Sequence, residues 1–360
     1  MGGVCNHAAS LVAGPGGILR HGQPVPRYAR RVTKNADAAD APGAELAYFS
    51  PPPPRILAHR GFIRDASPRA AGGVPRGGRS PGAGEVGTSS FGDLSPVENT
   101  HAAFAAALAL GASHLETDAH VTADGVAVLW HDPTLERFDG SRLTIADERW
   151  PALAKRRSQG AELMTLADAL AEFPGARFNI DVKTPAAAEP VARAVVAARA
   201  SGRVLLTSFT EANARAAWRH APDAARGATR ERIAAALAAI EVGSDRMLRR
   251  ALRDIDAVQV PERALGLSLV HPKRLPRLRR HVREVHVWTV NDETAMVRLW
   301  RAGVDGIVTD RTDLAVAARA SIAATASSFA DGSPPPAVSA PRHPDTPEAD
   351  AAGYEGRPRV

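Results

Sequence analysis

Short apolar runs alternate with segments of helical periodicity along the middle of the chain. The runs of strand length are residues 55–59, 114–118, 178–183, 204–209, 225–229, 257–260, 284–290 and 304–309. Segments with an apolar face at helical spacing separate most of them, namely 95–111, 163–173, 186–200, 211–220, 231–240 and 294–302. Eight strands with intervening helices predict an α/β fold, a (β/α)8 TIM barrel, because each crossover places parallel strands side by side.

The stretch 114–132 departs from this alternation. Its centre, Thr122-Ala123-Asp124-Gly125, carries an Asp-Gly pair between extended runs, which is typical of a β-hairpin. The arm that returns through residues 126–130 must then run antiparallel, because a parallel crossover needs a dozen or more residues. We therefore expect a hairpin after the second strand that brings His131 back beside Glu116 and Asp118.

A helix start is predicted at Ser95. Ser95 as N-cap, Pro96 at the first helical position and Glu98 three residues after the cap form the pattern of a capping box, and Gly111 ends the helix. Glu98 could equally serve the functional site, and the sequence leaves both roles open.

Composition divides the 360 residues into three parts. Residues 1–50 show no sustained period and are predicted to be a mostly disordered extension. Residues 51–320 form the predicted catalytic barrel, with a flexible Gly-, Pro- and Arg-rich insertion at 64–94 and a polar excursion near the site at 133–162. Residues 321–360 are rich in Ala, Ser, Pro and Gly and predict a disordered tail.

Charge and cysteine content narrow the class of protein. The net charge is +6, and 41 of the 45 basic residues are arginines spread along the chain. Their spacing at 246–253 and 274–283 favours solvated helix faces over a nucleic-acid site, so no nucleic-acid partner is expected. A lone Cys5 fits a reducing compartment, and no apolar run approaches the ~20 residues of a membrane span. We expect a cytoplasmic protein without stable membrane insertion, and the oligomeric state stays open.

Polar side chains gather where the predicted strands end, which is where barrels of this kind place their chemistry. Glu116 and Asp118 are i and i+2 on one strand and share a face, as do Asp181 and Lys183 on the next. Three carboxylates around one point suit Mg²⁺ or Ca²⁺. The cations Arg60 and Lys183 could clamp a phosphate ester, and the histidines that flank them, His59 and His131, could share proton transfer.

An ordered set of short motifs resembles the glycerophosphodiester phosphodiesterase family over roughly residues 55–315. The motifs are HRG at 59–61, ENT at 98–100, E-x-D at 116–118, HDPTLER at 131–137, NIDVK at 179–183, SF at 208–209, WTVND at 288–292 and GVDGIVTD at 303–310. Each motif alone is weak, but their common order is specific.

The resemblance implies a metal-dependent enzyme that hydrolyses small glycerophosphodiesters to sn-glycerol 3-phosphate and an alcohol. It places one divalent cation, Mg²⁺ or Ca²⁺, on Glu116, Asp118 and Asp181, and the acid/base pair on His59 and His131. It assigns phosphate contacts to Arg60 and Lys183 and a wall of the glycerol pocket to Trp288; Glu98 is a further candidate substrate contact. Asp181 stands where the family usually has glutamate, and the insertion at 64–94 is longer than usual.

Two alternatives remain open from the sequence. The same barrel could act as a phospholipase D- or C-like phosphodiesterase on lysophospholipids, which requires an apolar rim. A catalytically inactive, arginine-rich binding protein is a possibility of another class, but it predicts missing site residues, whereas both histidines and all three acids are present. For the neighbouring residues we expect lesser roles: packing or surface positions for His114 and His120, and turn caps for Asp305 and Asp310.

Overall fold

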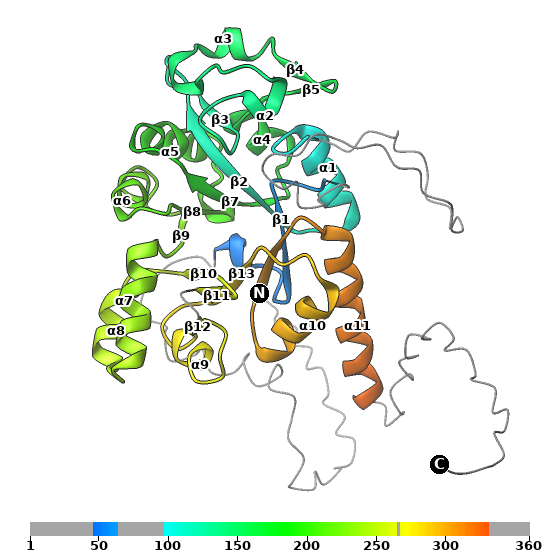
Figure 1. The fold of residues 1–360 in the computed structure, drawn as a ribbon, viewed down its shortest axis with the longest axis vertical. Coiled ribbons are helices and arrows are strands. Elements are labelled where there is room, and N and C mark those ends of the chain that lie inside the picture. Colours follow the sequence, from blue (N-terminus) through cyan, green and yellow to red (C-terminus); the bar gives the residue numbers. More distant parts are fainter. Residues whose placement is uncertain (1–45, 64–96, 265–266, 331–360) are drawn as a thin grey trace, which may run out of the picture.

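The structure is a computed structural model, and it describes residues 46–63, 97–264 and 267–330 (Figure 1). Several predictions fall outside the described residues. They are the insertion at 64–94, the cap at Ser95, and the parts of the two predicted tails at 1–45 and 331–360.

Eight parallel strands form the barrel, as the sequence predicts. In spatial order they are β10 (Ala257–Pro261), β13 (Glu284–Trp288), β14 (Gly306–Thr309), β1 (Arg55–His59), β2 (His114–Val121), β7 (Arg177–Val182), β8 (Val204–Thr207) and β9 (Ala225–Arg226). The two ends of this order meet only through a parallel bridge between Gly227 and Ala257. The barrel therefore closes at a weak seam between β9 and β10.

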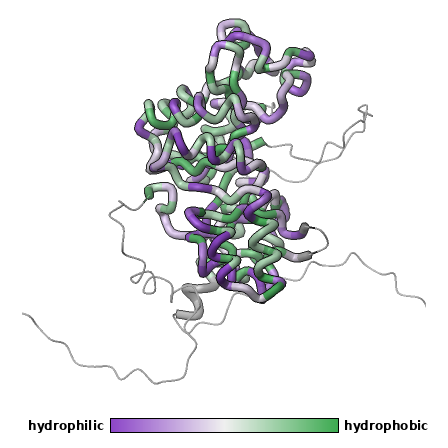
Figure 2. Tube along the Cα trace, turned by 90° about the vertical axis from the view of Figure 1, so that its left-hand side faces the viewer, coloured by the Kyte–Doolittle hydropathy of each residue, from purple (hydrophilic) through white to green (hydrophobic). Residues whose placement is uncertain are grey.

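Helices cover the outside of the barrel (Figure 1). They are α1 (His101–Leu110), α4 (Leu166–Glu172), α5 (Ala188–Ala197), α6 (Glu211–His220), α7 (Arg230–Glu241), α8 (Asp245–Ala251), α9 (Leu275–Leu278), α10 (Glu293–Ala302) and α11 (Thr312–Ala330). Figure 2 shows hydrophobic residues along the strands and the helices that pack on them. No helix within the described ranges is long and apolar enough to cross a bilayer.

The predicted start of the first helix is wrong. The α1 helix begins at His101, and Thr100 is its N-cap, with the hydroxyl accepting from the backbone N–H of Ala103. Asn99 adopts a left-handed φ of 57°, which no helix continues through, so a helix running from residue 95 is interrupted there. Glu98 consequently lies in the turn before the helix and does not cap it.

The ordered chain extends further at both ends than composition predicted. Tyr48, in the 3-10 turn η2 (Ala47–Phe49), is fully buried against Leu205, Ala225 and Ala257. At the other end α11 continues past residue 320 to Ala330, and its Ala315 and Ala318 are fully buried. Alanine favours helix but gives little amphipathic contrast, so the sequence pattern hid this helix.

The hairpin and the excursion after it form a second small core above the barrel (Figure 1). The predicted hairpin is confirmed: β3 (Ala127–Leu129) pairs antiparallel with β2, and Gly125 takes a φ of 81° in the turn. Trp130 packs edge to face against Phe138, and the partly buried Trp150 packs against the same cluster. The remaining elements are α2 (Glu136–Asp139), η3 (Ile145–Asp147), α3 (Trp150–Leu153), β4 (Arg157–Ser158), β5 (Ala161–Glu162) and β6 (Met164–Thr165), while β11 (Arg263–Ala264) and β12 (Leu267–Ser268) follow β10.

Candidate active site

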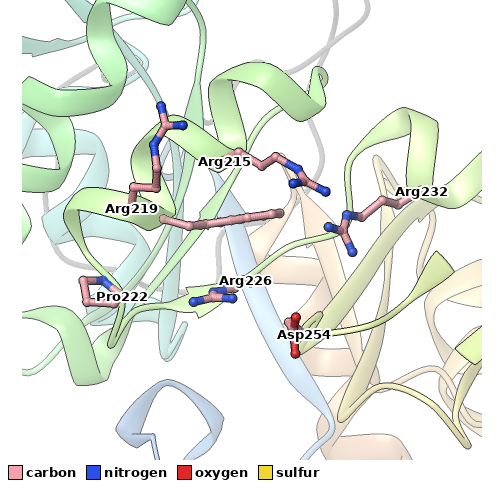
Figure 3. Close-up of a pocket in the computed structure, with 7 residues that line it drawn as sticks. Arg215, Arg219, Pro222, Arg226, Arg232 and Asp254 are labelled. Atoms are coloured by element: carbon pink, nitrogen blue, oxygen red, sulfur yellow. The ribbon is translucent and has the colours of Figure 1, made fainter. Parts of the chain in front are cut away.

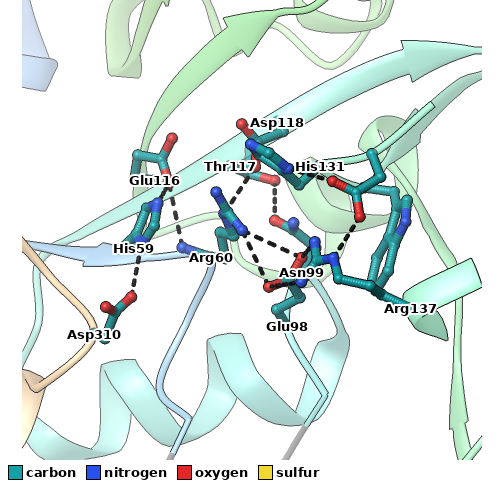
Figure 4. A network of polar contacts seen from close by, with 12 residues as sticks. His59, Arg60, Glu98, Asn99, Glu116, Thr117, Asp118, His131, Arg137 and Asp310 are labelled. Carbon is teal, nitrogen blue, oxygen red and sulfur yellow. Dashed lines mark hydrogen bonds and ion pairs between the residues drawn. The ribbon is translucent and has the colours of Figure 1, made fainter. Parts of the chain in front are cut away.

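Most of the predicted site residues gather at the carboxyl ends of β1, β2 and β7 and on the returning hairpin. Figure 4 shows those of β1, β2 and the hairpin. Parallel pairing sets this arrangement. His59 is in register with Glu116, and Asp118 is in register with Asp181. Groups from three separate segments of the sequence therefore meet at one edge of the barrel.

His59 is held by the last strand. Its Nδ1 lies 2.6 Å from the Asp310 carboxylate, and its Nε2 lies 3.8 Å from Glu116. Asn291 secures Asp310 by donating to its second carboxylate oxygen at 2.7 Å. Burial alone would raise the pKa of Asp310, but the hydrogen bond from His59 lowers it below its usual value. The carboxylate is therefore ionised, Nδ1 carries the proton, and Nε2 is left to face the site.

His131 has the same arrangement on the other side of the site. Its Nδ1 lies 2.6 Å from the Asp132 carboxylate, which in turn forms an ion pair with Arg137. Burial would raise the pKa of Asp132, but the hydrogen bonds from Arg137 and His131 lower it. Arg137 also stacks on the Trp130 ring, with 5.4 Å between the guanidinium carbon and the ring centre. Both candidate acid/base histidines thus have Nδ1 fixed by an ionised aspartate.

The three predicted metal ligands lie next to one another, with Lys183 between two of them. The Lys183 ammonium lies 2.6 Å from Asp118 and 2.8 Å from Asp181. Burial would lower the pKa of Lys183, but the two aspartates outweigh it and raise the pKa, so the ammonium stays charged.

Arg60 and Glu98 complete the network in Figure 4. The Arg60 guanidinium contacts Glu98 at 3.2 Å and Asp118 at 3.1 Å, and its backbone N–H donates to Glu116. Glu98 also accepts from Arg137 at 2.7 Å. Glu98 therefore bridges two arginines and keeps their charges from repelling one another.

The carboxylates differ in how well they are compensated. Burial and the neighbouring charge of Asp118 raise the pKa of Glu116 to about 7. Burial would also raise the pKa of Asp118, yet Lys183 and Arg60 lower it. Burial raises the pKa of Asp181. For His59 burial favours the neutral ring, but the charge of Glu116 and the hydrogen bond to Asp310 prevail and raise its pKa.

The donor set fits a hard divalent cation. Glu116, Asp118 and Asp181 supply only oxygen, as Mg²⁺ and Ca²⁺ require. The buried atom Asn179 Oδ1 accepts no hydrogen bond, and Asn179 is in register with Glu116; Asp118 Oδ2 has only the ion pair with Arg60. Within the described ranges no three His, Cys, Asp or Glu side chains are already arranged to hold a metal ion. Lys183 contacts both aspartates in this arrangement.

Trp288 lies apart from the charged network. It is the last residue of β13 and packs edge to face against Phe209, with 6.2 Å between ring centres. Phe209 is 54% exposed, and the Lys183 ammonium lies 6.0 Å from the centre of its ring. The two aromatic rings thus form an apolar wall beside the cations.

Three residues that the structure places at the site were given no catalytic or binding role from the sequence. Asp310 was expected to cap a turn, Arg137 was only a letter of the HDPTLER motif, and Asn179 only a letter of NIDVK. A signal existed for Asp310, since it directly follows the last strand of a predicted barrel. His114 and His120 are indeed packing residues, but both have partners, the carbonyls of Tyr48 and His131.

A parallel barrel with two aspartate-bound imidazoles, two cations and a carboxylate cluster at its strand ends is of the class of barrel hydrolases that act on phosphate esters. The glycerophosphoryl diester phosphodiesterase family model matches residues 76–314. A probable glycerophosphodiester phosphodiesterase of Mycobacterium tuberculosis is 38% identical over 222 residues, which cover 60% of this chain and 83% of that protein. The chain belongs to the glycerophosphoryl diester phosphodiesterase family, and it is an enzyme of that class.

Two further proteins show how the likeness extends. A phosphodiesterase of Oleispira antarctica, solved in complex with the product sn-glycerol-3-phosphate, superposes with a TM-score of 0.52 at 20% identity, covering 74% of this chain and 97% of that one. A lysophospholipase D of Homo sapiens is 33% identical over 101 residues, which cover 24% of this chain and 32% of that protein. The first supports the barrel fold, and the second is a local match.

Proposed function

We propose that the protein hydrolyses glycerophosphodiesters to sn-glycerol 3-phosphate and an alcohol, with His59 and His131 as the acid/base pair. One observation carries the mechanism. Both imidazoles have Nδ1 bound to an aspartate at 2.6 Å, so both present Nε2 to the same site. A carboxylate in this position fixes the tautomer of the ring and stabilises the imidazolium that forms when Nε2 takes a proton.

Arg60 and Lys183 bind the phosphodiester in this proposal. Both cations contact Asp118, at 3.1 Å and 2.6 Å, so they lie close enough to bind one anion together. Fixed cations that require no reorganisation stabilise the extra negative charge of the transition state more than they stabilise the substrate. The apolar wall of Phe209 and Trp288 receives the carbon skeleton of the glycerol.

Proton transfer then accompanies the displacement at phosphorus. The Nε2 atom of His59 takes the proton of the attacking hydroxyl, which belongs to water or to the 2-hydroxyl of the glycerol, and the oxygen forms a bond to phosphorus. The bond from phosphorus to the alcohol oxygen breaks, and this oxygen receives the proton of His131 Nε2–H. Attack by water yields the phosphomonoester directly, whereas attack by the 2-hydroxyl yields a cyclic phosphate that water opens in a second round.

A divalent cation, Mg²⁺ or Ca²⁺, would be held by Glu116, Asp118 and Asp181. When bound, it polarises the phosphoryl oxygens and lowers the pKa of the attacking hydroxyl. Burial and the charge of Asp118 together raise the pKa of Glu116 to about 7, and a cation held there would favour the ionised carboxylate.

The test is release of glycerol 3-phosphate from a panel of glycerophosphodiesters, with and without EDTA. His59→Ala and His131→Ala should each lose about 10²–10⁴-fold in kcat. His101→Ala is the matched control, because His101 is exposed and contacts Glu172 and Phe173 away from the catalytic site. Turnover that persists in either site variant, or that EDTA leaves unchanged, contradicts the corresponding part of the proposal.

Lysophospholipid is a second candidate substrate. The local match to a lysophospholipase D favours it, as does Phe209, a half-exposed aromatic ring beside the predicted phosphate contacts. A lysophospholipid carries an acyl chain that such a ring could receive. Faster release of the alcohol from lysophosphatidylcholine than from glycerophosphocholine would favour this substrate, and Phe209→Ser should then lower the first rate more than the second.

A further inference from the structure

A pocket on the outside of the barrel has no part in the site described above. It lies where α6 and α7 flank β9, next to the seam between β9 and β10 (Figure 3). The cavity measures about 410 Å³ and is lined by Arg215, Trp218, Arg219, Pro222, Arg226, Arg232 and Asp254. None of the candidate catalytic residues lines it.

Positive charge dominates the pocket. Four of its seven lining residues are arginines, and Asp254 is the acidic one. Glu211 compensates part of this charge from the side, because it pairs with Arg215 at 2.6 Å and with Arg232 at 2.8 Å. Among the described residues, neither Arg219 nor Arg226 has a carboxylate within 4.0 Å of its guanidinium group. The four arginines and two acids leave a net charge of about +2.

The arginines on the inner side of the pocket are held in place before any ligand arrives. Arg226 and Arg232 both lie over the Trp218 ring, with their guanidinium carbons 5.7 Å and 5.6 Å from its centre. Arg232 also donates to the backbone carbonyl oxygens of Ala251 and Arg253. Groups fixed in this way lose little conformational entropy when they bind.

We infer that this pocket binds a small ligand through a phosphate group. The planar fork of guanidinium donors matches phosphate oxygens two at a time, and a dianion matches the net charge. The volume lies within the ~300–1,000 Å³ of small-molecule pockets, so there is room for an organic part. Trp218 is only 6% exposed and is already covered by arginines, so its ring offers no platform on which a nucleobase could stack.

Such a ligand would link elements on either side of the seam between β9 and β10. Arg219 lies on α6, Arg226 on β9 and Arg232 on α7, and the strands behind them meet only through the Gly227–Ala257 bridge. A ligand that binds the folded chain and not the unfolded chain raises the unfolding temperature, and the stabilisation grows with the logarithm of 1 + [L]/Kd. Binding here should therefore stabilise the barrel.

The test uses inorganic phosphate as the probe in the full chain carrying Lys183→Met, which removes a predicted phosphate contact of the catalytic site. Phosphate is titrated at fixed ionic strength while heat of binding and Tm are measured. We expect saturable binding with a rise in Tm, and at least tenfold weaker binding once Arg219→Gln and Arg226→Gln are added. Glycerol 3-phosphate should bind at the same place, and succinate, a dianion without phosphate geometry, at least tenfold more weakly.

The matched control is Arg193→Gln with Arg301→Gln, which removes the same charge from exposed positions on α5 and α10. Equal binding in the pocket variant, equal weakening in the control, or equal affinity for succinate would each overturn the inference. Arg219→Gln alone changes one exposed side chain and serves if the double variant is unstable. Because no turnover is measured, failure here is distinct from failure of the proposed hydrolysis.

Discussion

Lys183 Nζ lies between Asp118 and Asp181, 2.6 Å from one carboxylate and 2.8 Å from the other. The register of β2 and β7 creates this position, because it sets the two aspartates side by side and Lys183 one pleat beyond Asp181. The ammonium separates two buried like charges and at the same time faces the site where the phosphate is proposed to bind.

Replacing Lys183 should therefore affect transition-state binding. We predict that Lys183→Met lowers kcat/KM for a glycerophosphodiester by about 10²–10³-fold, the cost of losing one fixed charge from such a site. Steady-state kinetics measure the change. Lys155→Met, at an exposed position in the excursion, is the control and should stay within a factor of two. A loss of less than tenfold would mean that Lys183 has only a structural role.

Asp310 is predicted to act through His59. In Asp310→Asn the amide can present the wrong group to Nδ1 and leave Nε2 protonated, so the ring no longer accepts a proton from the nucleophile. We expect kcat to fall about 10²–10⁴-fold with KM nearly unchanged. Asp223→Asn, an exposed change outside the site, provides the comparison. A rise in KM with an unaltered kcat would instead place Asp310 in substrate binding.

Arg137 is predicted to position two carboxylates at once, Glu98 and Asp132. Its planar fork reaches both, which a single ammonium group does not reproduce. Arg137→Lys should therefore be nearly as impaired as Arg137→Met, each losing about 10–100-fold in kcat, since orientation errors of this kind carry such costs. If lysine restores wild-type kcat, then charge alone matters and the positioning role is disproved.

The buried His114, the first residue of β2, predicts that the stability of the protein depends on pH. Burial, aided by the charge of Arg55, lowers the pKa of His114 to about 3. The unfolded chain takes up this proton near pH 6.5 while the folded chain does not, so the stability His114 contributes is present above pH 6.5 and is lost as the pH falls toward 3. We predict that wild type loses ~2 kcal/mol more than His114→Gln between pH 7.5 and pH 5.0. Urea unfolding at both pH values measures it, and equal losses would refute it.

Most of the barrel could be predicted from the sequence because its strands and helices have contrasting periods. The hairpin followed from Asp124-Gly125, and the sharing of a face by Glu116 and Asp118 followed from strand geometry alone. The start of α1 could not be predicted this way, because the left-handed turn at Asn99 goes with hydrogen bonds to Arg60 and Thr117, which are distant in sequence and leave no mark on the helical period.

The contacts of the site were only partly predictable. Neighbours in the sequence such as His131 and Asp132 could be seen directly, whereas His59 and Asp310 are 251 positions apart and meet through the pairing of β1 with β14. The contacts of Arg137 with Glu98 and Asp132 were not predicted either, because they depend on the path of the chain through residues 133–162. Expectations from spacing thus succeed within a strand or a hairpin and fail where barrel closure brings distant ends together.

In the two-histidine mechanism, the need for a general acid depends on the leaving group. A nitrophenolate departs without being protonated, whereas the alkoxide of choline needs a proton as the bond to phosphorus breaks. The contribution of a general acid should therefore vanish with the nitrophenyl substrate, while that of a general base should not.

The direct measurement is kcat of wild type, His59→Ala and His131→Ala on glycerophosphocholine and on glycerol 3-(4-nitrophenyl phosphate). The mechanism predicts that His131→Ala is impaired about 10²–10⁴-fold on the first substrate and less than tenfold on the second, while His59→Ala is impaired similarly on both. Equal impairment of both variants on both substrates would contradict the assignment of His131 as the acid that protonates the alcohol.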